Sequence, residues 1–118
     1  MARIGTRVRH ALSDPASGLQ TLTIRDDTGD TTEPHGLSQG EAVKEVWQIT
    51  PDDTSSARAV IRWTQRLSRG DWQVRRLVEI RMTGSETRFR MIARLTAWEG
   101  DRQVLQRDWS ETVPRRFV

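Results

Sequence analysis

Few side chains in this sequence could carry out nucleophilic or acid–base chemistry. Hydrolysis through a serine needs a histidine base that is oriented by an acidic residue, and the only histidines are His10 and His35. The sequence contains no Gly-x-Ser-x-Gly turn of the kind that presents a nucleophilic serine. Cysteine is absent, which excludes a thiolate nucleophile, a thiolate metal site and a disulfide. We therefore predict no catalytic residue in this chain.

The segment Asp26-Asp27-Thr28-Gly29-Asp30 superficially resembles a loop that binds a hard cation. It lacks the ligand spacing and the closing glutamate of an EF-hand calcium loop. A polar turn explains the same composition, so we predict neither a metal site nor a cofactor here.

Length and composition limit the class of protein. A chain of 118 residues fits a single domain spanning 1–118. No apolar run approaches the roughly 20 residues of a membrane-spanning helix, and no signal peptide is recognisable. We expect a cytoplasmic protein without membrane association.

The net charge of +3 comes from basic residues that are almost all arginine, Lys44 being the only lysine. A nucleic-acid-binding protein usually gathers its basic residues on one surface or in one run. Here arginine alternates with apolar residues, and acidic residues are mixed in throughout. We do not expect a nucleic-acid partner.

Apolar residues recur at every second position over 57–112, which is the period of a half-buried β-strand. The pattern predicts strands at 57–67, 72–82, 89–97 and 103–112, separated by turn-forming segments at 68–71, 83–86 and 99–101. The N-terminal half predicts strands at 1–9, 19–25 and 40–50, turns at 14–18 and 51–56, and a loop at 26–40. The fold class is therefore all-β, an antiparallel meander of about six to seven strands that forms a curved sheet or a partly closed barrel. Whether residues 1–50 close the barrel stays open.

The register follows from keeping one face apolar, because a slip of one residue would turn every side chain over. We predict Leu67 opposite Trp72 in the first hairpin and Met82 opposite Thr87 in the second. A three-residue loop at 99–101 determines the register of the last strand. In that register two large side chains lie opposite two small ones. The expected pairs in that strand are Leu105 with Ala97 and Trp109 with Ala93.

The same register predicts charge pairs on the opposite face. Asp108 should lie opposite Arg94, and Glu79 opposite Arg90. It also predicts two appositions of like charge, which are Arg75 with Arg94 and Arg81 with Arg88.

Several short motifs resemble one protein family. They are Ser56-Ala57-Arg58-Ala59, Arg69-Gly70-Asp71-Trp72-Gln73-Val74-Arg75, Ala97-Trp98-Glu99-Gly100-Asp101 and Val113-Pro114-Arg115. Together they resemble the C-terminal segment of CocE/NonD-family hydrolases, which include acyl esterases and X-Pro dipeptidyl-peptidases. The resemblance implies a non-catalytic β-rich region attached to an α/β-hydrolase domain, and that domain would carry the Ser-His-Asp triad. Position 88 is an arginine where the family pattern tends to place histidine.

Two functions follow as hypotheses. The first is an accessory domain that packs against a hydrolase catalytic domain or forms a homo-oligomer, with Val60, Leu77, Ile92, Arg94 and Trp98 as interface residues. The second is a small-ligand-binding protein with an apolar pocket, in which Arg76 would meet a ligand carboxylate. The pocket residues would be Trp63, Trp72, Arg76, Phe89, Met91 and Trp109.

Overall fold

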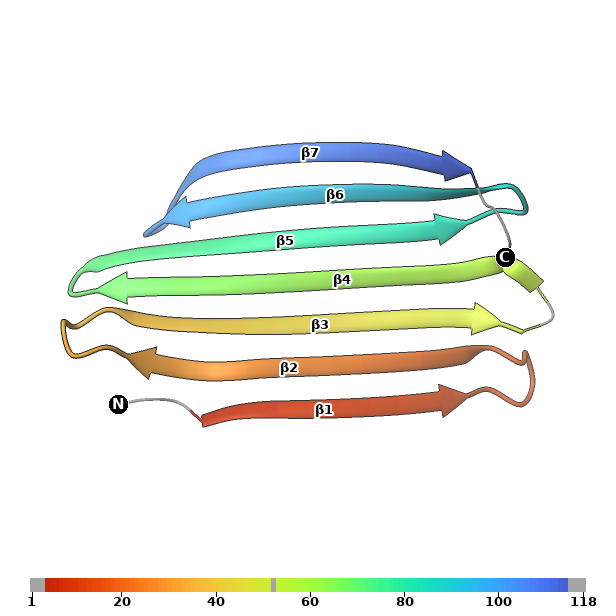
Figure 1. Cartoon of the computed structure of the whole chain (residues 1–118), viewed down its shortest axis with the longest axis horizontal. Helices are drawn as coiled ribbons and strands as arrows, with labels where there is room; N and C mark the ends of the chain where they lie inside the picture. The colour runs from red at the N-terminus through yellow and green to blue at the C-terminus, as the bar shows by residue number, and fades with distance from the viewer. Residues whose placement is uncertain (1–3, 52, 115–118) are drawn as a thin grey trace.

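The computed structural model describes residues 4–51 and 53–114, which form one antiparallel sheet (Figure 1). Each strand pairs with the next one along the chain, so the spatial order is the sequence order. The strands are β1 (Ile4–Ser13), β2 (Gln20–Thr32), β3 (Ser38–Thr50), β4 (Asp53–Arg69), β5 (Trp72–Gly84), β6 (Arg88–Glu99) and β7 (Arg102–Pro114).

The predicted all-β meander is confirmed, and the sheet is curved but not closed. Residues 4–50 supply three of the strands, yet β1 and β7 make no contact with each other. The sheet therefore has two edges in the described part of the chain (Figure 1).

The sheet forms a single layer. Ala59, at 3% exposure, and Ala97, at 7%, are the only buried hydrophobic residues among those described. The accessible surface is 8901 Å², whereas a compact monomer of this mass would expose about 6,600 Å². The radius of gyration is 18.0 Å, against about 13.5 Å for a compact domain of this length. The apolar side chains that the sheet brings together are thus largely open to solvent.

In the first two hairpins the predicted faces are correct and the predicted partners are wrong. Arg69 pairs with Trp72 across a two-residue loop, in which Gly70 has a φ of +59°, so the predicted Leu67–Trp72 closure is off by two residues. Met82 lies opposite Met91 rather than near Thr87. Both errors are even numbers of residues, which leaves every side chain on its predicted face.

The predicted placement of the last strand is confirmed. Leu105 lies opposite Ala97, and Trp109 lies opposite Ala93. The connecting loop has two residues, not three, because Glu99 pairs with Arg102. A β-bulge adds the missing residue within β7 and restores the register.

The loop predicted at 26–40 is wrong over most of its length. β2 continues to Thr32 and β3 starts at Ser38, which leaves a short turn between them. β4 already starts at Asp53, so the predicted turn at 51–56 is also shorter. The predicted turn at 14–18 is confirmed, since the Gly18 amide donates to the Asp14 carbonyl at 2.8 Å. The predicted strand at 40–50 is confirmed as part of β3.

One glycine leaves room for an ion pair that spans three strands. Gly40 lies between Asp30 on β2 and Arg66 on β4, and the Arg66 guanidinium reaches over it to Asp30 at 2.9 Å. A Cβ at position 40 would lie 2.8 Å from the Gly29 carbonyl oxygen and 2.9 Å from the Arg66 guanidinium, and closer still to the Asp30 carboxylate. Only glycine leaves room for this pair.

We expect Gly40→Ala to lower the free energy of unfolding by about 1–3 kcal/mol, because the new methyl group overpacks against backbone and side chain. Urea denaturation followed by circular dichroism measures the change. Gln39→Ala is the matched control, since Gln39 is the neighbouring exposed residue of the same strand. Equal midpoints for the two variants would contradict the prediction.

Candidate binding surfaces

One face of the sheet is predominantly apolar. Directly opposed residues point to the same side of a sheet, and residues two apart along a strand share a face. The apolar face, as used below, consists of Leu22, Ile24, Val43, Trp47, Ala59, Ile61, Trp63, Val78, Ile80, Met82, Met91, Ala93, Leu95, Ala97, Leu105 and Trp109. Several of its large members are exposed, among them Trp47 at 37% and Met91 at 38%.

A groove of about 1000 Å³ lies at one end of the apolar face. Its lining residues come from all seven strands, including Ala11 on β1, Trp47 on β3, Met91 on β6 and Val113 on β7. Because both edge strands contribute, the sheet curves around the groove. Apolar side chains dominate the lining, so the groove suits an apolar occupant.

The groove contains two of the six predicted pocket residues. Phe89 and Met91 line it, whereas Trp63, Trp72, Arg76 and Trp109 do not. Trp72 is 46% exposed and Trp109 is 51% exposed.

Trp47, which lines the groove and lies opposite Ala59, was not among the predicted pocket residues. Trp47 lies in the strand predicted at 40–50, and this position could have indicated that its side chain joins the apolar face. The pairing of that strand with 57–67 was not part of the prediction.

A polar row crosses the apolar face near the other end. Glu41, Gln65 and Arg76 follow one another across β3, β4 and β5. The side-chain amide nitrogen of Gln65 donates to the Glu41 carboxylate at 3.3 Å, and the side-chain oxygen of Gln65 is buried without a hydrogen-bond partner among the described residues. The Arg76 guanidinium lies 5.7 Å from the Trp63 ring centre, within the range of a cation–π contact. The fold thus brings Trp63 and Arg76 together, but outside the groove.

The opposite side of the sheet carries most of the basic residues. The arginine face, as used below, consists of Arg25, Lys44, Arg58, Arg62, Arg66, Arg75, Arg81, Arg88, Arg90 and Arg94. Strand alternation gathers these residues on one surface, although they are dispersed in the sequence. The absence of a nucleic-acid partner stays a prediction. It was argued from arginines that are dispersed along the sequence, and in the folded sheet these arginines lie together on one face.

Three of these residues pair with carboxylates in the part of the chain that the structure describes. Arg66 pairs with Asp30, Arg94 with Asp108 at 2.8 Å, and Arg62 with Glu79 at 3.8 Å. The predicted Asp108–Arg94 pair is confirmed. The predicted Glu79–Arg90 pair is wrong, because Glu79 lies opposite Arg62 and Arg94.

The five predicted interface residues share the arginine face. Val60 is 38% exposed and Ile92 is 42% exposed. The predicted like-charge appositions are wrong, because Arg81 lies opposite Ile92 and Arg75 lies opposite Trp98. The Arg75 guanidinium lies 4.3 Å from the Trp98 ring centre, which partly covers the indole. The remaining two, Leu77 and Arg94, lie on the neighbouring strands β5 and β6.

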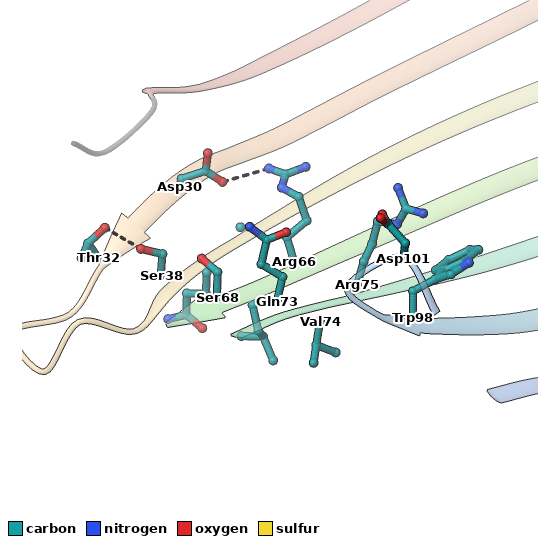
Figure 2. Close-up of a pocket in the computed structure, with 14 residues that line it drawn as sticks. Asp30, Thr32, Ser38, Arg66, Ser68, Gln73, Val74, Arg75, Trp98 and Asp101 are labelled. Carbon is teal, nitrogen blue, oxygen red and sulfur yellow. Dashed lines mark hydrogen bonds and ion pairs between the residues drawn. The ribbon is translucent and has the colours of Figure 1, made fainter. Parts of the chain in front are cut away.

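A polar hollow of about 600 Å³ lies at the end of the sheet away from the groove. Figure 2 shows the residues that line it. Its charged lining residues are Asp30, Arg66, Arg75 and Asp101. Two carboxylates face two guanidinium groups, so the hollow carries no net charge. It offers no preference for an anion or a cation.

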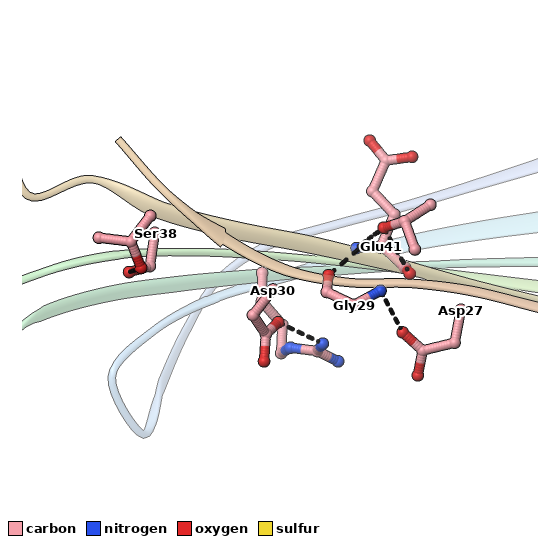
Figure 3. A network of polar contacts seen from close by, with 8 residues as sticks. Asp27, Gly29, Asp30, Ser38 and Glu41 are labelled. Atoms are coloured by element: carbon pink, nitrogen blue, oxygen red, sulfur yellow. Dashed lines mark hydrogen bonds and ion pairs between the residues drawn. The ribbon is translucent and has the colours of Figure 1, made fainter. Parts of the chain in front are cut away.

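The acidic segment at 26–30 is a bulged strand, not the predicted polar turn (Figure 3). The Gly29 amide donates to the Asp27 carboxylate at 2.9 Å, and Gly29 has a φ of +76°. The Thr28 hydroxyl contacts both the amide and the carbonyl of Glu41 at 3.1 Å. The polar groups therefore stabilise the bulge. No cluster of three or more His, Cys, Asp or Glu that could hold a metal ion is present in 4–51 and 53–114.

The described strands and turns include no helix that could cross a membrane. Comparison with family models, with curated proteins and with solved structures found no match. The resemblance to CocE/NonD hydrolases and the cytoplasmic location stay predictions.

The Arg94–Asp108 pair affects the pKa of Asp108. The hydrogen bond from Arg94 holds the pKa of Asp108 below its ordinary 3.8. A lowered pKa in the folded state means that the pair stabilises the fold above about pH 3.8, and that this contribution is lost as the pH falls through the folded-state pKa. Both side chains are more than half exposed, so the effect on stability is small.

We expect Arg94→Gln to raise the pKa of Asp108 toward 3.8. Titration of the side-chain carboxyl by NMR measures it. Arg90→Gln is the control, since Arg90 is on the same strand and face but lies opposite Thr112. An Asp108 pKa that stays the same in Arg94→Gln would show that the pair does not persist in solution.

Proposed function

We propose that this chain is a non-catalytic accessory module that binds another protein layer through its apolar face. The observation that carries the proposal is the single-layer architecture. The sheet collects large apolar side chains on one face and buries only Ala59 and Ala97 among its described hydrophobic residues. A sheet normally covers such a face with a second layer.

The exposed area indicates how large the missing layer is. The chain exposes about 2,300 Å² more than a compact monomer of its mass. Covering that much surface on each chain is within the range of obligate interfaces. A large uncovered apolar patch on a soluble chain marks an interaction site.

The resemblance to CocE/NonD hydrolases supports a hydrolase catalytic domain as the partner, and any hydrolysis would belong to that domain. For the chain on its own, the available second layer is another copy of itself. The purified chain should then pack apolar face against apolar face.

Met91 and Ile92 provide a matched test of this packing. They are neighbours on β6 with similar exposures of 38% and 42%, and they point to opposite faces. We expect Met91→Glu to reduce the mass of the assembly measured by light scattering, because it places a charge in the apolar face. Ile92→Glu should leave the mass unchanged.

Circular dichroism of both variants controls for unfolding. Loss of the assembly in Ile92→Glu alone would move the interface to the arginine face, where the sequence analysis placed it. A wild-type mass that does not respond to Met91→Glu would rule out apolar-face packing.

The groove supports a second candidate function, which is binding of an apolar ligand. Its volume of about 1000 Å³ could hold a ligand of drug size, and Trp47 lies in its lining. Arg76 lies outside the lining, so the predicted contact with a ligand carboxylate would need a ligand that extends beyond the groove.

Dodecanoate is a suitable probe because it combines an apolar chain with a carboxylate. We expect it to change the tryptophan fluorescence of the wild type, and the change to be lost in Trp47→Phe. Trp72→Phe is the control, since Trp72 lies away from the groove. The same response in both variants would exclude the groove as the site.

A further inference from the structure

The two edges of the sheet differ in how they could meet a second chain. β7 is an edge strand whose 13 residues are all exposed. Leu105, Trp109 and Val113 point to the side of the apolar face and are 37%, 51% and 45% exposed. Such an edge presents unpaired backbone groups to any strand that can match it.

We propose that β7 pairs antiparallel with β7 of a second copy, with Trp109 on the two-fold axis. In this register Arg107 of one copy lies opposite Glu111 of the other, and Leu105 lies opposite Val113. Each pair occurs twice because the interface is symmetric. On the other side of the sheet, Asp108 meets Ser110 and Gln106 meets Thr112.

This register makes every pair complementary. The apolar side holds one aromatic pair, two ion pairs and two aliphatic pairs, all of which are favourable across strands. Moving the axis by one residue, to Asp108, would put Leu105 opposite Glu111. Moving it to Ser110 would put Arg107 opposite Val113. The sequence of β7 therefore selects a single register.

Arg107 and Glu111 both lie opposite uncharged residues of β6. Arg107 lies opposite Leu95, and Glu111 lies opposite Met91. Neither residue forms an ion pair with another described residue. Pairing of two β7 strands supplies each with an opposite charge.

The other edge of the sheet is unsuited to the same pairing. β1 carries Arg7 and Arg9 on one side. Self-pairing about the middle of β1 would set Arg7 opposite Arg9, or Arg9 opposite itself, and like charges directly opposite each other destabilise the pair. The second copy is therefore expected at β7 only.

This inference is independent of the proposed function. The two-fold axis stands perpendicular to the sheet, so both apolar faces lie on the same side of the joined sheet and stay available for a second layer. Edge pairing and face packing can each occur without the other.

A charge exchange tests the pairing. Arg107→Glu alone should weaken the dimer about tenfold or more in sedimentation equilibrium, because it replaces two attractive pairs by two repulsive ones. Glu111→Arg alone should do the same. The double variant Arg107→Glu/Glu111→Arg should dimerise like the wild type. A double variant as weak as the single ones would overturn the proposal.

The same experiment in a Trp47→Glu background separates edge pairing from face packing, because Trp47 lies on the apolar face but on β3, away from β7. If β7 pairs, Trp47→Glu still forms dimers, and adding Arg107→Glu dissociates them. If Trp47→Glu is monomeric by itself, only face packing exists and the edge proposal fails. Association that survives both changes would also overturn it.

Disulfide cross-linking tests the register directly. The sequence has no cysteine, so each introduced cysteine can pair only with its copy in the second chain. Trp109→Cys should form a disulfide-linked dimer on mild oxidation, since directly opposed Cβ atoms are about 4.5–5.5 Å apart. Ala93→Cys, in the same cross-strand row on β6, and Arg9→Cys on β1 should not. Equal cross-linking of all three would mean random collision and would overturn the proposal.

Discussion

The structure depends on the two-residue period of its strands, which passes from each hairpin to the next. Every strand pairs with its neighbour in sequence, so the parity set in one hairpin passes to the next. The pairing shifts at Thr28 on β2, between Gln48 and Thr50 where β3 meets β4, and in β7 near Leu105. At Thr28 and in β7 a bulge takes up one extra residue, and the alternation of faces continues beyond it. This parity sorts the side chains into an apolar face and an arginine face.

Sorting by parity gives the sheet two unlike surfaces but no interior. A sheet buries its apolar face against another layer, and the described residues provide none. On the arginine face, contacts within the sheet offset the positive charge of only some of the arginines. Arg66 reaches across Gly40 to Asp30, Arg94 meets Asp108, and Arg75 stacks on Trp98. These local contacts offset part of the repulsion between the arginines, while the apolar face remains the surface that gains most from a partner.

Curvature forms a groove at one end of the apolar face. There, Ala11 of the first strand and Val113 of the last contribute to the same lining. At the other end the row of Glu41, Gln65 and Arg76 interrupts the apolar surface, and Gln65 keeps a buried side-chain oxygen without a hydrogen-bond partner among the described residues. The apolar surface is thus continuous near the groove and divided by polar groups elsewhere, which restricts where an apolar ligand or layer could fit closely.

The sequence by itself determined the all-β class, the meander and the face of the residues in the strands from 57 to 97 and from 105 to 112, because side-chain parity survives any even error in register. It also determined the Leu105–Ala97 and Asp108–Arg94 pairs, in which size and charge complement each other. Only the tertiary structure decided the loop lengths, the continuation of β2 through the acidic segment and the place of Trp47 in the groove. The loop lengths and the continuation of β2 depend on backbone geometry. The position of Trp47 depends on how β3 pairs with β4, and the alternation of apolar residues is compatible with several registers of that pairing. Positive φ at Gly29 and Gly70, for instance, permits a bulge and a tight turn that composition alone does not distinguish from longer loops.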